Sequence, residues 1–242
     1  MVECRSWGIM DAGLYIVGTP IGHLDDMSMR AVQTLRDADL ILAEDTRHTR
    51  KLLSHYEIRV PMTSCHKFNE ASRVASVTRK IADEDAAVAL VSNAGMPVVS
   101  DPGARMVAAC REQGVLVTVI PGPSAVTTAL ALSGFGGTGF HFEGFLSHKG
   151  AARRRRLEAL SDSTVPVVLF ESPHRILKLM GELEDIMPER EVMAGRELTK
   201  RYEEVLSGTP AAVREAFADR TPRGEFTVVI AAAPKRRRSA GD

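Results

Sequence analysis

Cysteine is scarce in this sequence, aromatic residues are few, and neither sign of charge dominates. The three cysteines, Cys4, Cys65 and Cys110, are odd in number and far apart, and no His or Cys residues stand at metal-ligand spacing. Neither a disulfide framework nor a metal site is indicated, so no bound metal is expected. This cysteine usage is typical of a reducing compartment, and we expect the protein to be cytoplasmic.

Long apolar runs are also missing. No stretch approaches the roughly 18 apolar residues that a membrane-spanning helix needs, so the sequence does not predict a membrane protein. The first dozen residues lack the apolar core of a secretory signal, although a short organellar address stays open. Because 31 basic residues balance 31 acidic ones, any affinity for nucleic acid must come from local clusters of charge.

Two common nucleotide-binding patterns are absent as well. The first predicted strand, 14–17, runs into Gly-Thr-Pro-Ile-Gly, which is neither G-x-G-x-x-G nor the G-x-x-x-x-G-K of a P-loop. The sequence therefore suggests neither a nicotinamide dinucleotide nor a nucleoside triphosphate as ligand.

Apolar runs alternate with helix-like segments along the chain, which predicts an α/β protein. The first series predicts an N-terminal α/β domain over 12–134 with a mostly parallel sheet. Four glycines within 133–139 predict a flexible linker. A glycine-rich phosphate-binding loop is the alternative, but no predicted strand leads into this segment. The second series predicts a C-terminal α/β domain over 140–233, and 234–242 read as a basic, disordered tail.

Three loops rich in small residues follow predicted strands, at 18–22, 92–103 and 121–125. In open α/β sheets ligands bind beyond the carboxyl ends of the strands, so these loops are expected to line one pocket. The alternative for the second loop is a plain strand-to-helix turn, with Asp101 capping a helix that Pro102 begins.

A fourth predicted strand end, at 43–47, carries the polar residues Glu44, Asp45, Thr46 and Arg47. One interpretation is a ligand site at the sheet edge. The other is helix capping by Thr46, with the two acids favoured by the positive end of the helix.

Basic residues cluster near two predicted helix starts and in the tail. Cations at a helix N-terminus oppose the helix dipole by roughly 0.3–1 kcal/mol each, a cost that a phosphate partner relieves. RNA is the expected polyanion, whereas the alternative is an ordinary solvated face. No stacking aromatic residues are interleaved with the basic ones, so single-strand binding of the OB-fold kind is not supported.

Six motifs, in this order over about 14–232, resemble the motif series of the bacterial ribosomal RNA small subunit methyltransferase I family. They are Thr-Pro-Ile-Gly-His-Leu at 19–24, Ala-Glu-Asp-Thr-Arg-His-Thr at 43–49, Ser-Asn-Ala-Gly-Met-Pro at 92–97 with Ser-Asp-Pro-Gly at 100–103, Pro-Gly-Pro-Ser-Ala at 121–125, Glu-Ser-Pro-His-Arg at 171–175 and Arg-Glu-Leu-Thr-Lys at 196–200.

The resemblance implies two α/β domains of the tetrapyrrole methylase type, with S-adenosylmethionine in a cleft between them, and a homodimer. It implies 2′-O-methylation of a cytidine in the decoding region of small-subunit ribosomal RNA. Two alternatives stay open: a methylase of tetrapyrrole or corrin compounds, and an RNA-binding homologue with impaired catalysis.

The resemblance also assigns the cofactor-binding residues, whereas the candidates for proton transfer and RNA binding follow from the chemistry of the step and from the clusters of charge. The expected cofactor-binding residues are Thr19, Pro20, Gly22, Ser92, Asn93, Ala94, Gly95, Gly122, Ser124 and Ala125. The candidates for accepting the proton of the 2′-hydroxyl are Glu44, Asp45 and Lys200. The expected RNA-binding residues are Arg47, Arg50, Lys51, Arg153, Arg154, Arg155, Arg156, His174 and Arg175.

Two positions depart from the family pattern, which has Asp in place of Asn93 and Thr in place of Met96. An Asn side chain keeps an acceptor oxygen but loses the charge, which weakens a charge-assisted contact by about 1–2 kcal/mol. The departures are the reason why the alternative of impaired catalysis stays open.

Overall fold

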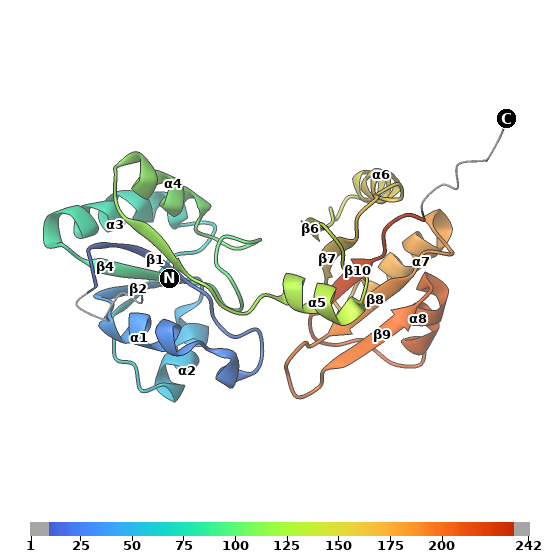
Figure 1. Cartoon of the computed structure of the whole chain (residues 1–242), viewed down its shortest axis with the longest axis horizontal. Helices are drawn as coiled ribbons and strands as arrows, with labels where there is room; N and C mark the ends of the chain where they lie inside the picture. The colour runs from blue at the N-terminus through green and yellow to red at the C-terminus, as the bar shows by residue number, and fades with distance from the viewer. Residues whose placement is uncertain (1–9, 235–242) are drawn as a thin grey trace. The chain divides into compact units, whose positions relative to one another are not determined.

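The computed structural model describes residues 10–234, and the chain divides after Ser124 into two compact units (Figure 1). Each unit contains one five-stranded sheet with helices packed against it. Among the described residues no helix is both long and apolar enough to span a membrane. The predicted fold class, two α/β domains, is confirmed.

The first unit has an entirely parallel sheet with the strand order β3-β2-β4-β1-β5. Its strands are β1 (Gly13–Val17), β2 (Leu40–Ala43), β3 (Met62–Ser64), β4 (Ala87–Val91) and β5 (Val117–Ile120). Its helices are η1 (Leu24–Asp26), α1 (Met29–Asp37), α2 (Thr46–His55), α3 (Glu70–Glu84) and α4 (Ala104–Glu112).

Helices cover both faces of this sheet. Leu35 of α1 and Leu53 of α2 pack with Ala89 on one face, and Val77 of α3 and Met106 of α4 pack with Leu90 on the other. All five residues of β4 are buried, which explains its unbroken apolar sequence Ala-Val-Ala-Leu-Val.

The second unit has a mixed sheet with the order β6-β7-β10-β8-β9, in which only β6 and β7 pair in parallel. Its strands are β6 (His141–Phe145), β7 (Val167–Glu171), β8 (Val192–Arg196), β9 (Glu204–Gly208) and β10 (Phe226–Ile230). Its helices are α5 (Ala125–Ser133), α6 (Gly150–Leu160), α7 (Ile176–Ile186) and α8 (Pro210–Ala216).

The core of the second unit gathers α6, α7 and α8 over one face of its sheet, through residues such as Leu157, Leu179 and Phe217. Because side chains alternate along a strand, the buried Val168 and Val229 point to the opposite face. Helix α5 contacts β7, β8 and β10, and we assign it to that opposite face.

The division between the units lies earlier than predicted. The predicted first domain, 12–134, includes the segment 124–133, and the glycines within 133–139 were predicted to form the linker. Instead α5 packs with the sheet of the second unit, so the boundary falls in the turn before Ala125. The sequence did not predict this boundary because α5, Ala-Val-Thr-Thr-Ala-Leu-Ala-Leu-Ser, has no distinct apolar face. The sequence of such a helix does not indicate which sheet the helix covers.

Two strands lacked a sequence signal. β3 has only three residues, all half-buried, and β9 alternates between half-buried and exposed positions at the end of its sheet. The basic residues Lys235, Arg236, Arg237 and Arg238 of the predicted tail lie outside the described residues.

Candidate functional site

The three predicted ligand loops follow β1, β4 and β5, which lie side by side in the first sheet. β1 pairs in parallel with β4 on one side and with β5 on the other, so the three carboxyl ends share one edge. The backbones of Thr19 and Gly95 exchange hydrogen bonds of 2.9 and 3.1 Å, which join the first loop to the second. The loops therefore converge, as the sequence predicted.

The first and third loops touch through two glycines. A Cβ atom built on Gly18 would lie 2.7 Å from the Cα atom of Gly122, and one built on Gly122 would lie 2.8 Å from the Cα atom of Gly18. Real Cβ atoms do not approach backbone this closely, so neither position accepts a side chain without separating the loops. The Sδ atom of Met96 would lie 2.6 Å from the same Gly18 Cβ, so Met96 packs against this junction.

Thr19 is buried at the centre of the loop cluster. Its hydroxyl lies 3.4 Å from the carbonyl oxygens of both Ser92 and Gly95, to which it donates. Gly95 has φ +77°, a conformation in which a Cβ atom is strained. Hydrogen bonds from the backbone and from the Thr19 hydroxyl thus hold the first and second loops together.

Asn93 carries an unused acceptor in this cluster. Its Oδ1 atom is buried and has no hydrogen-bond partner in the described chain, while its backbone N–H donates to the Oε2 atom of Glu44 at 3.2 Å. A buried polar atom without a partner costs roughly 1–3 kcal/mol, so its presence calls for a ligand or a water. An acceptor among backbone amides and carbonyls fits a zwitterionic, cationic ligand such as S-adenosylmethionine.

The other predicted cofactor residues lie on the same loops with different exposure. Pro20 is buried, whereas Gly22 and Ala94 are exposed, and Ser124 is half-buried. Ala125 begins α5 and belongs to the second unit.

The loop after β4 is strained and is held by a residue that sequence reasoning missed. Val98 and Ser100 have φ of +76° and +68°, which side-chain-bearing residues rarely adopt. The helix starts later than the capped turn predicted: α4 begins at Ala104 with Gly103 as its N-cap, and Gly103 supplies no side-chain cap. Instead the buried Glu70 of α3 accepts from backbone N–H groups of α4 and its N-cap.

The predicted proton acceptors are divided between the two units. Glu44 lies at the end of β2, beside Asn93, whereas Lys200 belongs to the second unit. Asp45, rather than the predicted Thr46, is the N-cap of α2, and its Oδ1 atom accepts from the Arg47 N–H at 2.8 Å. This bond to Arg47 lowers the pKa of Asp45, which suits a cap and makes it a poor base.

Lys200 is engaged by two carboxylates. Its Nζ atom lies 2.9 Å from Glu197 Oε1 and 2.8 Å from Glu225 Oε2. Burial alone would lower the pKa of Lys200, but the bonds to Glu225 and Glu197 outweigh it and raise the pKa. A lysine that holds its proton this firmly is unsuited to accept another group's proton at neutral pH.

Helix α2 presents exposed basic side chains close to the loop cluster. Arg47 pairs with Asp45 at 3.5 Å, whereas Arg50 and Lys51 are exposed and have no ion-pair partner among residues 10–234. Since α2 begins directly after the tip of β2, these cations lie beside the edge that carries the ligand loops.

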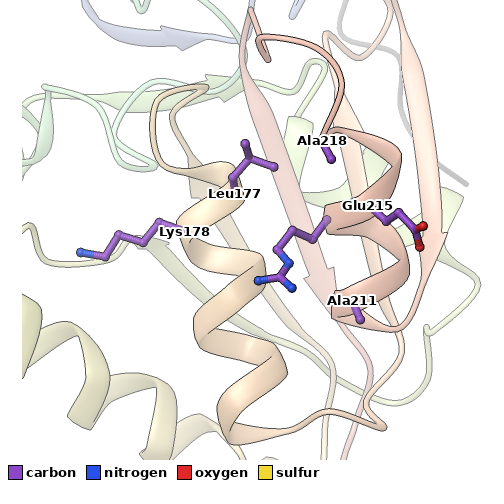
Figure 2. Close-up of a pocket in the computed structure, with 6 residues that line it drawn as sticks. Leu177, Lys178, Ala211, Glu215 and Ala218 are labelled. Carbon is purple, nitrogen blue, oxygen red and sulfur yellow. The ribbon is translucent and has the colours of Figure 1, made fainter.

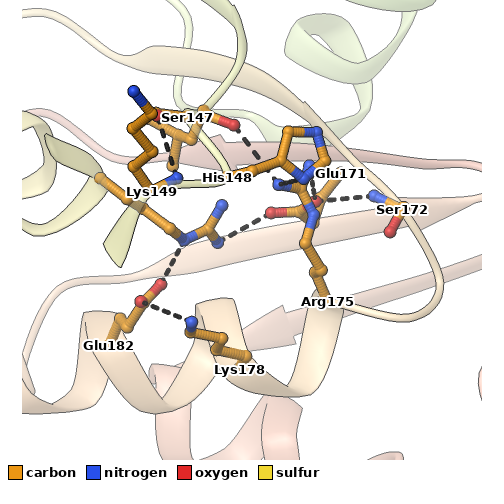
Figure 3. A network of polar contacts seen from close by, with 10 residues as sticks. Ser147, His148, Lys149, Glu171, Ser172, Arg175, Lys178 and Glu182 are labelled. Carbon is orange, nitrogen blue, oxygen red and sulfur yellow. Dashed lines mark hydrogen bonds and ion pairs between the residues drawn. The ribbon is translucent and has the colours of Figure 1, made fainter. Parts of the chain in front are cut away.

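The arginine run of α6 does not form one basic face, which corrects the predicted RNA contact at Arg153. The Arg153 side chain is 1% exposed. Its partners Glu171 and Glu182 belong to a polar network at the end of β7 (Figure 3). Its guanidinium binds Glu182 at 2.5 Å and Glu171 at 2.8 Å. The Glu171 side chain has no exposed surface, so its buried charge needs the guanidinium of Arg153 inside the fold. Arg153 is therefore unable to reach a phosphate of the RNA.

Arg175 shares this network. It binds the Oε1 atom of Glu171 at 2.8 Å and contacts the ring of His148, and its side chain is 17% exposed, so most of it is also committed to the fold. His174, the neighbouring predicted RNA contact, is exposed.

The remaining arginines of the run are exposed but differ in their partners. Arg154 pairs with Glu158 at 3.0 Å, and Arg156 pairs with Glu143 at 2.6 Å. Arg155 is exposed and has no ion-pair partner in the described part of the chain.

A hollow of about 720 Å³ lies between α7 and α8 of the second unit (Figure 2). None of the predicted site residues lines it. The residues that do so are Leu177, Lys178, Ala211, Arg214, Glu215 and Ala218. It carries no cluster of groups suited to methyl transfer, so the loop edge of the first sheet is the candidate active site.

Comparison with known proteins identifies the family of the chain. The sequence pattern of the tetrapyrrole (corrin/porphyrin) methylases matches residues 13–213. Ribosomal RNA small subunit methyltransferase I of Thermotoga maritima is 46% identical over 217 residues, which cover 90% of this chain and 97% of the relative. The Synechocystis protein of the same name is 45% identical over 91% of this chain and 79% of its own length.

Solved structures share the fold at low identity. Cobalt precorrin-4 methyltransferase has a TM-score of 0.68 at 17% identity, covering 90% of this chain and 94% of its own. Uroporphyrin-III C-methyltransferase of Thermus thermophilus, solved with S-adenosyl homocysteine, has a TM-score of 0.63 at 17% identity, covering 90% and 97%. The fold and the relatives together show that this chain belongs to the ribosomal RNA small subunit methyltransferase I family of the tetrapyrrole methylases.

Proposed function

We propose that the chain transfers a methyl group from S-adenosylmethionine to the 2′-hydroxyl of a cytidine in the decoding region of small-subunit ribosomal RNA. The observation that carries the proposal is the convergence of three small-residue loops, the second of which carries the Asn93 Oδ1 acceptor without a partner in the described chain. Relatives that share 45–46% of their residues with this chain and bear the name of such an enzyme support it.

The loop cluster suits the cofactor better than it suits a phosphate ligand. When bound, S-adenosylmethionine supplies an electrophilic methyl group on a positively charged sulfur. We assign its binding to the loops of Thr19, Asn93 and Gly122, where the backbone offers both amides and carbonyls. The Asn93 Oδ1 atom, which has no partner in the described chain, would accept a hydrogen bond from a donor of the bound cofactor.

For the chemical step the protein must align the ribose oxygen and help remove its proton. Glu44 is the proton acceptor that we favour, because it lies beside the second ligand loop. Its Oε2 atom accepts a hydrogen bond from the Asn93 N–H of that loop. Asp45 serves as a helix cap, and Lys200 holds its own proton.

Exposed cations of α2, above all Arg50 and Lys51, are the RNA contacts that we propose next to this site, with Arg47 beside them. Arg154, Arg155, Arg156 and His174 are proposed as further contacts on the second unit. The enzyme is expected to act in the cytoplasm and as a homodimer, as the family resemblance implies.

The test is methyl transfer with labelled S-adenosylmethionine to two acceptors offered separately. The acceptors are small ribosomal subunits from cells that lack this enzyme activity, and uroporphyrinogen III. We expect label only in the RNA, recovered as 2′-O-methylcytidine after digestion. Label in the tetrapyrrole, or in neither acceptor, would overturn the proposal.

The Glu44→Gln variant tests the proton acceptor in the same assay. We expect a fall in kcat of about 100-fold or more, with unchanged affinity for the cofactor, since general bases contribute this much. Asp45→Asn is the matched control, and a similar loss there would count against Glu44 as the base.

A further inference from the structure

An exposed phenylalanine stands at the same sheet edge as the ligand loops. The segment 65–69 follows β3, and the Cys65 N–H donates to the carbonyl of Ala43, the last residue of β2, at 2.8 Å. β2 is the strand that delivers Glu44 and that separates β3 from β4. The segment therefore begins about 10 Å, or two strand spacings, from the end of β4.

The segment is held firmly by its own hydrogen bonds. The Oδ1 atom of Asn69 accepts from the His66 N–H at 2.7 Å, and its Nδ2 atom donates to the Ser64 carbonyl and hydroxyl at 3.2 and 3.1 Å. The Phe68 N–H donates to the His66 Nδ1 atom at 3.3 Å. The Asn69 side chain thus shapes this turn and makes no side-chain cap for α3.

This ordered turn leaves the Phe68 side chain 93% exposed, the most exposed large hydrophobic residue in the described chain. Its only ring neighbour there is His66, whose ring centroid lies 6.2 Å away at an interplanar angle of 65°. The hydrogen-bonded turn thus holds both faces of the ring open to solvent, where the ring is available to stack with a partner.

Charge around Phe68 favours a polyanionic partner. Lys67 is its neighbour and is exposed, and Arg50 and Lys51 of α2 follow the adjacent strand β2. Unpaired RNA bases stack on aromatic rings whose surroundings bind the phosphates, and such stacking tolerates any base because every base has a π-face.

The same turn is tied to the strained loop after β4. Glu70 follows Asn69 directly and accepts the N–H of Gly103 at 3.2 Å and that of Arg105 at 2.8 Å. The position of Phe68 is therefore fixed relative to the loop that begins at Ser92.

We propose that Phe68 is a stacking platform for an unpaired base of the RNA substrate, next to the nucleotide that receives the methyl group. The inference rests on the proposed function and goes beyond it by naming a residue that positions the substrate. The platform holds the RNA strand at the edge where Glu44 and the methyl donor meet.

The test measures RNA methylation and RNA binding separately for Phe68→Ala, Phe68→Tyr and Phe68→Trp. For Phe68→Ala we expect the KM for small ribosomal subunits to rise about 5- to 100-fold, with kcat and the Kd for S-adenosylmethionine unchanged. Tyr and Trp keep a stacking face, so both should restore the KM to within about threefold of the original. Leu116→Ala is the control, because Leu116 is 45% exposed and lies just before β5, at the amino-terminal ends of the strands and away from the ligand loops.

A fluorescence signal tests stacking without any catalysis. Phe68→Trp is combined with Trp7→Phe, which removes the single natural tryptophan, so that the indole at 68 is the sole reporter. Addition of a short single-stranded RNA should quench its emission, and the quenching should weaken with salt. No quenching would overturn the stacking platform.

The outcomes separate this inference from the proposed function. If the unaltered protein methylates RNA and Phe68→Ala has the same KM, the stacking platform is overturned and the proposed function stands. Absence of RNA methylation by the unaltered protein would overturn the proposed function, whereas the quenching experiment would still decide on stacking. A change of oligomeric state in Phe68→Ala, at unaltered RNA affinity, would assign Phe68 to a contact between copies of the chain and overturn the inference.

Discussion

The Oε1 atom of Glu70, at the start of α3, lies 2.8 Å from the backbone nitrogen of Arg105 in the first turn of α4. The same oxygen accepts from Gly103 at 3.2 Å and from Met106 at 3.1 Å. One helix is thus capped by a carboxylate from another. Because Gly103 ends the loop that begins at Ser92, Glu70 also fixes one end of the proposed cofactor loop.

Removal of Glu70 should destabilise the fold and weaken cofactor binding together. Glu70→Ala leaves three backbone N–H groups without their acceptor, two of them on buried residues, so we expect the free energy of unfolding to fall by about 2–3 kcal/mol. Glu70→Gln keeps an acceptor and loses the charge at the helix N-terminus, for about 1 kcal/mol. Denaturant unfolding measures the loss of stability, and calorimetry with S-adenosylmethionine measures the loss of cofactor affinity.

The matched control lies at the other end of the same helix. Glu84 pairs with Lys80 on an exposed face, and Glu84→Ala should cost less than about 0.5 kcal/mol. Equal losses from Glu84→Ala and Glu70→Ala would show that the cap has no special role.

Gly18→Ala should damage the site more than the fold. The new Cβ atom would collide with the backbone of Gly122 and with the Sδ atom of Met96, so the first and third loops must separate. We expect the affinity for S-adenosylmethionine to fall at least tenfold, as measured by calorimetry. Gly136→Ala is the control, because nothing lies within 4 Å of a Cβ atom there. An unchanged affinity in Gly18→Ala would show that the loop junction does not shape the cofactor site.

Arg153→Met should destabilise the second unit without acting as an RNA-contact mutation. Burial disfavours the charge of Arg153, but its bonds to Glu182 and Glu171 outweigh this and raise its pKa. Loss of the guanidinium removes the partner of Glu182 at 2.5 Å and one of the two arginines that bind the fully buried Glu171, for which we expect about 3 kcal/mol of lost stability in thermal unfolding. Arg154→Met breaks only the exposed pair with Glu158 and should cost less than about 0.5 kcal/mol. Equal stability of the two variants would contradict the structural role of Arg153.

The loops of the candidate site were predictable from sequence because their signals are local. An apolar run followed by Gly, Pro and Ser predicts both a strand and the loop after it. Parallel strands then bring their carboxyl ends, and these loops, to the same end of the sheet. Even Gly18 and Gly122 stand at the expected turns, although their mutual contact requires the sheet order β4-β1-β5, which sequence spacing does not give.

What the sequence could not show are contacts between distant positions. Arg153 and Glu171 are 18 residues apart, and nothing local distinguishes this buried arginine from its three exposed neighbours. Glu70 looked like an ordinary acid in the first turn of α3, and its real partners lie more than 30 residues away. The assignment of α5 to the second sheet was hidden for the same reason.

The stability contributed by Lys200 should depend on pH in the alkaline range. Its pKa is raised in the folded chain by Glu225 and Glu197 against the effect of burial, so the bond stabilises the fold fully below the unfolded pKa of about 10.4. As the pH rises through the folded pKa, that contribution is lost. We therefore expect the stability gap between the unaltered protein and Lys200→Met to be constant from pH 7 to 9 and to close above about pH 10. A gap that instead closes near neutral pH would mean that Lys200 titrates there and is available as a base.

Asn93→Asp should strengthen the cofactor site if the unpaired Oδ1 atom faces a donor of S-adenosylmethionine. A carboxylate keeps the acceptor in place and adds charge, and a charge-assisted bond is stronger than a neutral one by about 1–2 kcal/mol. The nearby Glu44, which accepts the Asn93 N–H at 3.2 Å, opposes this gain by repulsion between like charges. The double variant Asn93→Asp with Glu44→Gln removes that repulsion. We therefore expect calorimetry to show about tenfold tighter binding in the double variant than in Glu44→Gln alone. Unchanged or weaker binding would mean that the Asn93 acceptor faces water, and that another residue holds the cofactor.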